Sequence, residues 1–200
     1  GHRFARYADD CNIYVCTHRA GERVMASITR FLGRRLKLRV NKAKSAVAHP
    51  HQRKFLGFSF FYRKEPQRRV APQALFKQRV RELTRRSCGR SLAQIVPELS
   101  RYLIGWRGYF GFCETPLTLR DLDAWVRRRL RAIAWAQWKY GPNRFAELRR
   151  LGVGKDLAAQ TAGSPHGVWR ISNSPALSIA FPNAYFRGLG LASIYIQSAE

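Results

Sequence analysis

Acidic residues are scarce in this chain of 200 residues. It contains 12 Asp and Glu against 37 Lys and Arg, which gives a formal net charge of +25. So much like charge destabilises a compact protein unless a polyanion neutralises it, and nucleic acid is the commonest such partner. The composition is nevertheless typical of a globular protein, because 46% of the residues are hydrophobic and 12% are aromatic.

The sequence also lacks an apolar run of membrane-spanning length, a lipidation motif and a secretory signal. An anionic membrane surface, the other partner that a cationic chain could have, is therefore disfavoured. None of the four cysteines stands in a CxxC pair, so neither a zinc ribbon nor a redox motif is supported. We expect reduced thiols and a cytoplasmic protein associated with nucleic acid.

The first seventy residues mix β-rich runs with one helical pattern. Residues 4–16, FARYADDCNIYVC, hold two β-rich runs around a short acidic step, which is a hairpin signature. Apolar spacing predicts an amphipathic helix over 21–36, followed by a short strand over 38–40. KFLGFSFFY at 54–62 predicts a strand, and a turn through Glu65 and Pro66 allows a return strand ending near Val70.

From Pro72 onward, apolar residues recur at helical spacing. They predict helices over 73–87 and 92–110, with Pro97 in the first turn of the second helix or at a kink. Thr118 and Asp121 form a candidate cap for a third helix, and three consecutive helices predict a bundle.

After residue 140 the apolar pattern loosens. A short helix is predicted around 145–151, and Ser174 followed by Pro175 is a good start for a last helical segment. The chain is therefore expected to be α+β, with boundaries at 1–72, 73–140 and 141–200.

Asp9 and Asp10 are adjacent carboxylates on the predicted hairpin turn. Like charges so close repel each other, and a bound divalent ion would offset this cost. An ordinary solvated turn is the alternative, because Asp is common in turns. The β-rich runs on both sides, with Tyr7 directly before, make the pattern more specific. YADD in this setting resembles motif C of reverse transcriptases.

Further segments resemble the same family in the correct order. LKLRVNKAKS at 36–45 resembles motif D, and KFLGFSF at 54–60 resembles motif E. RELTRRSCGRSLAQIVPELSRYLIGWRGYF at 81–110 and RDLDAWVRRRLRAIAWAQWK at 120–139 are similar to the maturase domain of group II intron proteins. ELRRLGV at 147–153 and GVWRISNSPALSIAF at 167–181 also fit. The resemblance to group II intron-encoded reverse transcriptase/maturases thus covers essentially the whole chain.

The resemblance implies a right-hand polymerase, with the end of its palm in 1–72 and a helical thumb and maturase region after it. Asp9 and Asp10 match the carboxylates that bind Mg²⁺, and Lys44 matches the motif D lysine near the departing pyrophosphate. Leu56 and Gly57 match the hairpin that grips the primer. The implied substrates are an RNA template, a DNA primer and deoxynucleotide triphosphates, and the implied partner is group II intron RNA.

Relatives carry a third metal-binding Asp and the fingers upstream of YADD. Neither is found in this sequence, which begins without methionine. We therefore expect a fragment without polymerase activity of its own, which the missing N-terminal half of the polymerase would complete.

Basic residues crowd the predicted helices. A solvated face is the ordinary interpretation of such a run, but acidic residues are nearly absent after Asp123, so intramolecular pairing does not explain the excess. Contact with an RNA backbone is favoured, because guanidinium groups hold phosphates with two bonds. The residues predicted to bind nucleic acid are Arg85, Arg86, Arg127, Arg128, Arg129, Arg131 and Lys139.

The aromatic residues of these helices could stack on bases, but their helical spacing favours packing in the core. This applies to Trp106, Tyr109, Phe110, Trp125, Trp135 and Trp138. Two functions remain open: an RNA-directed DNA polymerase and maturase in the intact protein, or a non-catalytic RNA-binding splicing cofactor. An inactive remnant is a further alternative.

Overall fold

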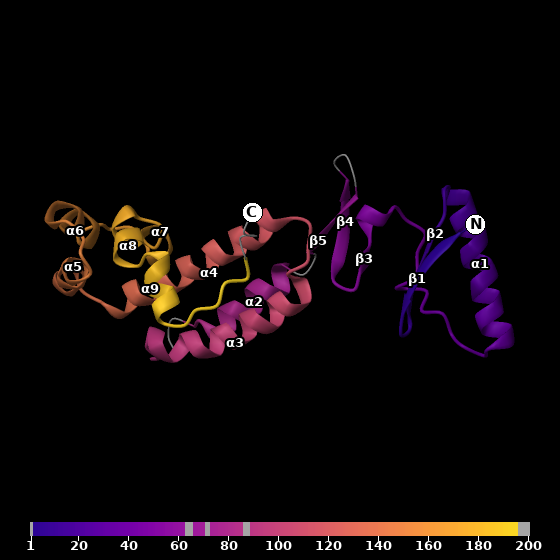
Figure 1. Cartoon of the computed structure of the whole chain (residues 1–200), viewed down its shortest axis with the longest axis horizontal. Coiled ribbons are helices and arrows are strands. Elements are labelled where there is room, and N and C mark those ends of the chain that lie inside the picture. The colour runs from indigo at the N-terminus through magenta and orange to yellow at the C-terminus, as the bar shows by residue number, and fades with distance from the viewer. Residues whose placement is uncertain (1, 63–65, 71–72, 86–88, 196–200) are drawn as a thin grey trace. The chain divides into compact units, whose positions relative to one another are not determined.

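The computed structural model describes residues 2–62, 66–70, 73–85 and 89–195. The chain divides into two compact units, residues 1–71 and residues 72–200, and each is described by itself. Figure 1 shows the helices and strands of both units with their labels. Small antiparallel sheets lie in the first unit and helices dominate the second, which confirms the α+β class. The assignments to palm and thumb remain predictions.

The first unit begins with the predicted hairpin. Strands β1 (Arg3–Tyr7) and β2 (Asp10–Tyr14) pair antiparallel, with Tyr7 opposite Asp10, so Ala8 and Asp9 form the turn. Ala8 has a φ of 51°, a left-handed conformation that is uncommon for residues other than glycine. The hairpin presents the acidic pair at its tip.

Helix α1 (His18–Arg35) follows, and the side chain of Thr17 caps it by accepting a hydrogen bond from the backbone N–H of Ala20. The strand predicted over 38–40 is wrong. Lys37 adopts a left-handed φ of 53°. The backbone N–H of Leu38 then donates a hydrogen bond to the carbonyl oxygen of Leu32, in the last turn of α1. This segment closes the helix end, so it is not available for a strand ladder.

A second sheet has the order β3-β4-β5 and is antiparallel throughout. Its first two strands are joined by Leu56 and Gly57, both with positive φ, at 50° and 76°. Two consecutive residues with positive φ form a tight two-residue hairpin loop, whose twist matches that of the flanking strands. The predicted strand and return strand are confirmed, while the turn at 63–65 lies outside the described residues. The bounds are β3 (Lys54–Phe55), β4 (Phe58–Tyr62) and β5 (Pro66–Val70), after a single 3-10 turn (Pro50–Gln52).

The hydrophobic core lies mainly in the second unit. Among the described residues of the first unit, the buried hydrophobic side chains are Phe58 and Val70, which face each other across β4 and β5. In the second unit, α2 contacts α3 and α3 contacts α4. Their fully buried side chains include Phe76, Val80, Ile95, Leu99, Leu103, Leu130, Ile133 and Trp135.

The three predicted helices of the bundle are confirmed, with changes at their ends. They are α2 (Gln73–Leu83), α3 (Leu92–Phe110) and α4 (Pro116–Gln137), and Pro97 lies within α3 without ending it. The cap predicted at Thr118 is wrong, because Thr115 is the N-cap and Pro116 is the first helical residue. The fixed φ of proline suits that first position, and the helix therefore starts three residues earlier.

Short helices complete the second unit, and α7 packs against α4 (Figure 1). The predicted start at Ser174 is confirmed, since its Oγ accepts a hydrogen bond from the backbone N–H of Leu177 at 3.3 Å and Pro175 follows it. Residues 141–195 thus belong to the same unit as the bundle. These helices are α5 (Gly141–Arg150), α6 (Lys155–Ala162), α7 (Val168–Ile171), α8 (Pro175–Ala180) and α9 (Asn183–Gly188).

Candidate nucleic-acid interface

Three cations from two helices surround the ring of Trp125 on α4. The Lys77 ammonium lies 5.8 Å from the ring centroid, and the Arg81 and Arg129 guanidinium carbons each lie 5.5 Å from it. Lys77 and Arg81 are four positions apart on α2, as Trp125 and Arg129 are on α4, so each pair shares one face of its helix. The face of an indole ring attracts cations. We call these four residues the Trp125 cation cluster.

Arg129 joins the two helices of this cluster. Its Nε donates to Thr84 Oγ1 at 2.8 Å, and its Nη2 donates to the Thr84 carbonyl oxygen at 3.0 Å. Thr84 is fully buried directly after the end of α2, and its hydroxyl donates in turn to the carbonyl oxygen of Val80. A cation at this end also interacts favourably with the helix dipole. Arg129 is therefore held in a fixed orientation beside Trp125.

The charges of Lys77 and Arg81 are not neutralised locally. Within the part of the chain that the structure describes, neither side chain forms an ion pair, whereas Arg79 on the same helix pairs with Glu82 at 2.9 Å. Arg85, just beyond α2, is exposed. Like charges gathered around one ring repel one another, and an anionic ligand would relieve this repulsion.

Two other arginines of α4 bind the C-terminal helices. Arg128 donates to the Trp169 carbonyl oxygen at 2.8 Å and to Ser172 Oγ at 3.3 Å. Both Nε and Nη2 of Arg131 donate to the Phe181 carbonyl oxygen, at 3.2 and 2.9 Å. Burial lowers the pKa of Arg131, and the like charge of a neighbouring arginine lowers this pKa further, although a guanidinium stays protonated at neutral pH.

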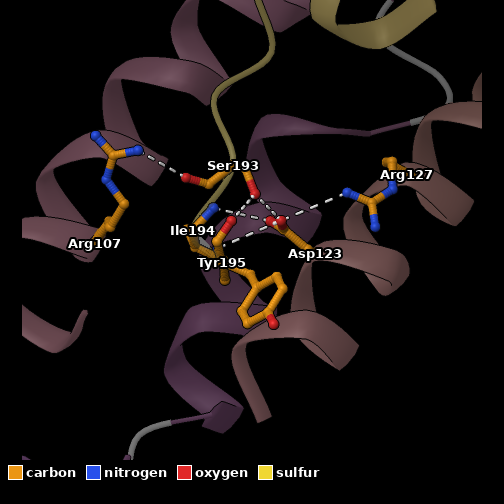
Figure 2. A network of polar contacts seen from close by, with 6 residues as sticks. All are labelled: Arg107, Asp123, Arg127, Ser193, Ile194 and Tyr195. Carbon is orange, nitrogen blue, oxygen red and sulfur yellow. Dashed lines mark hydrogen bonds and ion pairs between the residues drawn. The ribbon is translucent and has the colours of Figure 1, made fainter. Parts of the chain in front are cut away.

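Arg127 belongs to a network of polar contacts around Asp123 that holds residues 193–195 (Figure 2). Asp123 Oδ1 accepts from the Ile194 backbone N–H at 3.0 Å, and the Ser193 hydroxyl donates to the same carboxylate. Arg107 Nη1 donates to the Ser193 carbonyl oxygen at 3.0 Å. We call residues 189–195 the C-terminal strap. It is fixed to both α3 and α4.

The scarcity of acidic residues suggested that intramolecular pairing does not explain the excess of arginines on α4. The structure shows that these arginines do have intramolecular partners: Arg127 pairs with the Asp123 carboxylate, and carbonyl oxygens, a hydroxyl oxygen and aromatic rings serve the others. RNA contacts by Arg127, Arg128 and Arg131 remain a prediction. Lys139 is exposed just after α4, with a φ of 53°, and Arg86 lies outside the described residues.

Lys77 and Arg81 were not among the site residues predicted from the sequence. Their spacing of four on one helix was visible in the sequence, but their approach to Trp125 depends on how α2 and α4 pack. Trp135 and Trp106 are buried as predicted, while Trp125 is only half-buried.

The residues assigned to polymerase chemistry lie in the first unit. Asp9 stands in the β1–β2 turn and Asp10 begins β2, and both are exposed. Lys44 is exposed in a turn where Asn41 Oδ1 accepts from its backbone N–H at 3.2 Å. Leu56 and Gly57 form the tip of the β3–β4 hairpin.

Asp9 and Asp10 do not form a complete metal site by themselves. Across residues 2–62, 66–70, 73–85 and 89–195, no three His, Cys, Asp or Glu side chains come together to hold a metal ion. Two carboxylates supply only part of the oxygen ligands that phosphoryl transfer with Mg²⁺ requires. Binding of Mg²⁺ by this pair stays a prediction.

Comparison with known families decides the nature of the helical unit. Residues 73–152, which run from α2 through α5, match the family model of the group II intron, maturase-specific domain. This segment, here called the maturase domain, is similar to that family. The resemblance to group II intron maturases is thereby confirmed, and the whole Trp125 cation cluster lies within this maturase domain. No curated protein matches the chain.

The described helices give no sign of a membrane-spanning segment. None of them is both long enough and apolar enough to cross a bilayer. The match does not extend to residues 1–72, whose resemblance to polymerase motifs stays a prediction.

Proposed function

We propose that this chain binds group II intron RNA through the Trp125 cation cluster and thereby helps the intron to fold and splice. The observation that carries the proposal is the convergence of Lys77, Arg81 and Arg129 on one ring, inside the maturase domain. Lysine and arginine contacts to phosphates provide most of the affinity for a nucleic acid, because they release condensed counterions. The cluster supplies such contacts on two helices at once.

The chemistry of the cluster suits a phosphate backbone. Arg81 is exposed and presents a planar fork that can hold one phosphate with two hydrogen bonds. Lys77 is half-buried and acts as a point charge one turn away. Arg129 is already bonded to Thr84, so it contributes mainly through its fixed charge. Folded RNA is recognised largely by shape and backbone, which such a surface can read.

A second activity, RNA-directed DNA synthesis, is proposed for the intact protein. The order of the motifs in residues 1–72 supports it, as does the exposure of Asp9 and Asp10 at a hairpin tip. Synthesis would need Mg²⁺, a template, a primer and deoxynucleotide triphosphates, together with a third carboxylate. The alternative is a splicing cofactor without catalysis, which uses the maturase domain alone.

Competition binding tests the first proposal. A labelled group II intron RNA is bound to the chain and displaced by unlabelled intron RNA or by an unrelated folded RNA of the same length, at one salt concentration. Displacement by the intron RNA at lower concentration supports maturase binding. Equal displacement by both RNAs would contradict it, because a maturase must distinguish its intron.

A further inference from the structure

Arg128 on α4 and Trp169 on α7 form a stacked pair on the surface of the second unit. The Arg128 guanidinium carbon lies 4.1 Å from the centroid of the Trp169 ring, the shortest cation–ring distance among the described residues. The guanidinium also donates to the Trp169 carbonyl oxygen and to Ser172 Oγ, and the Ser172 hydroxyl donates to the same carbonyl oxygen at 2.7 Å. The pair is therefore fixed in orientation before any ligand binds.

The ring of Trp169 remains open to solvent despite this contact. Trp169 is 39% exposed, whereas Trp106 and Trp135 in the same unit are 8% and 1% exposed. An aromatic ring that is held in place and keeps part of its surface in water can accept a further stacking partner. Arg170, the next residue in the chain, is also exposed and carries a positive charge.

We propose that the Arg128–Trp169 pair is a stacking platform for an unpaired base of the bound RNA. The inference rests on the proposed RNA binding and adds a second contact to it. Bases in a duplex are covered by their neighbours, whereas a base in a loop or bulge can stack on an aromatic ring or a guanidinium plane. The platform lies partly outside the matched segment 73–152, because Trp169 follows it.

The test uses two RNAs that differ by a single feature: a blunt duplex, and the same duplex with one bulged uridine. Trp169→Ala is expected to weaken binding of the bulged RNA about 5- to 150-fold, the range of one lost stacking contact. Binding of the plain duplex should change less than about twofold, and Trp169→Phe, which keeps an aromatic face, should retain most of the affinity. If Trp169→Ala leaves the preference for the bulged RNA unchanged, the proposal is refuted.

Tyr140→Ala is the matched control. Tyr140 is 72% exposed, and no ring or cation stacks on it in the part of the chain that the structure describes. Its removal should leave both affinities within about twofold. An equal loss in this variant would show that the effect belongs to any exposed ring, and it would overturn the assignment to Trp169.

A cross-linking measurement on the unmodified chain guards against misfolding of the variants. With 5-iodouridine at the bulge, irradiation should join the RNA to the peptide that contains Trp169. Cross-links only to other peptides would refute the platform. Failure of the platform can be distinguished from failure of the proposed RNA binding. If only the platform is wrong, Lys77→Gln with Arg81→Gln still lowers the affinity for both RNAs, while Trp169→Ala changes the affinity for neither.

Discussion

The carboxylate of Asp123 accepts a hydrogen bond from the backbone N–H of Ile194, at 3.0 Å and 71 positions further along the chain. Asp123 lies within the maturase-specific domain, and Ile194 lies in the C-terminal strap beyond it. The Asp123 side chain is 5% exposed, and Ile194 is 1% exposed. A buried charge is tolerated only when its hydrogen-bonding partners are in place. The C-terminal strap therefore packs into the core of the maturase domain, although residues 189–195 lie outside the matched segment 73–152.

Asp123→Asn should destabilise the second unit. The substitution removes the charge that the Ile194 N–H, the Ser193 hydroxyl and Arg127 share. Because hydrogen bonds to charged groups contribute about 1.5–3 kcal/mol, we expect the free energy of unfolding to fall by about 1–3 kcal/mol in urea titrations. Asp121→Asn, at an exposed position two residues earlier, should change it by less than about 0.5 kcal/mol. An equal change in the free energy of unfolding in both variants would show that the contact between Asp123 and the strap does not stabilise the second unit.

Arg131→Lys should also lower stability although it preserves the charge. The planar fork of Arg131 places two donors on the Phe181 carbonyl oxygen, and an ammonium group on a shorter stem cannot reproduce both bonds. We expect a loss of about 1–2 kcal/mol in the free energy of unfolding. Arg150→Lys, an exposed position paired with Glu147, serves as the control and should change little. Thermal unfolding of the wild-type and both variants measures the difference, and identical midpoints would contradict the structural role of Arg131.

Asp9→Asn should separate the two proposed activities. We expect the chain alone to extend no primer on an RNA template with Mg²⁺, and extension to appear when a matching N-terminal half is added. In that mixture Asp9→Asn should abolish extension and leave intron RNA binding by the second unit unchanged. Extension by the chain alone would mean that the third carboxylate is not required. Extension by the Asp9→Asn mixture would show that Asp9 is not a catalytic ligand.

Several features of the fold could be read from the sequence because they depend on local chemistry. The start of α8 follows from Ser174 before Pro175, and the first hairpin follows from two β-rich runs around an acidic turn. The start of α4 differs from the cap predicted at Thr118, because the helix begins at Pro116 after Thr115, and the fixed φ of proline suits the first helical position. The segment 38–40 was misjudged because a helix-closing hydrogen bond of Leu38 leaves no sign in the sequence.

The candidate site was only partly predictable. The sequence identifies α4 as basic, but it does not tell which guanidinium groups face carbonyl oxygens and which cations face a ring. Arg131 reaches a carbonyl oxygen 50 positions away, and Lys77 approaches a ring on a different helix. Such contacts depend on the packing of helices that are distant in sequence. Charge scarcity alone therefore cannot separate structural arginines from those that bind RNA.

The most direct test of the central claim is a salt titration of intron RNA binding by two double variants of equal charge change. Lys77→Gln with Arg81→Gln removes two cations that pair with no carboxylate among the described residues. Arg79→Gln with Arg150→Gln removes two cations that already pair with Glu82 and Glu147. We predict that the first pair lowers the slope of log affinity against log salt by about 1.4–1.8, since each lost phosphate contact contributes about 0.7–0.9, and that the second pair leaves it nearly unchanged. Equal slopes for the two double variants would contradict binding of RNA through the Trp125 cation cluster.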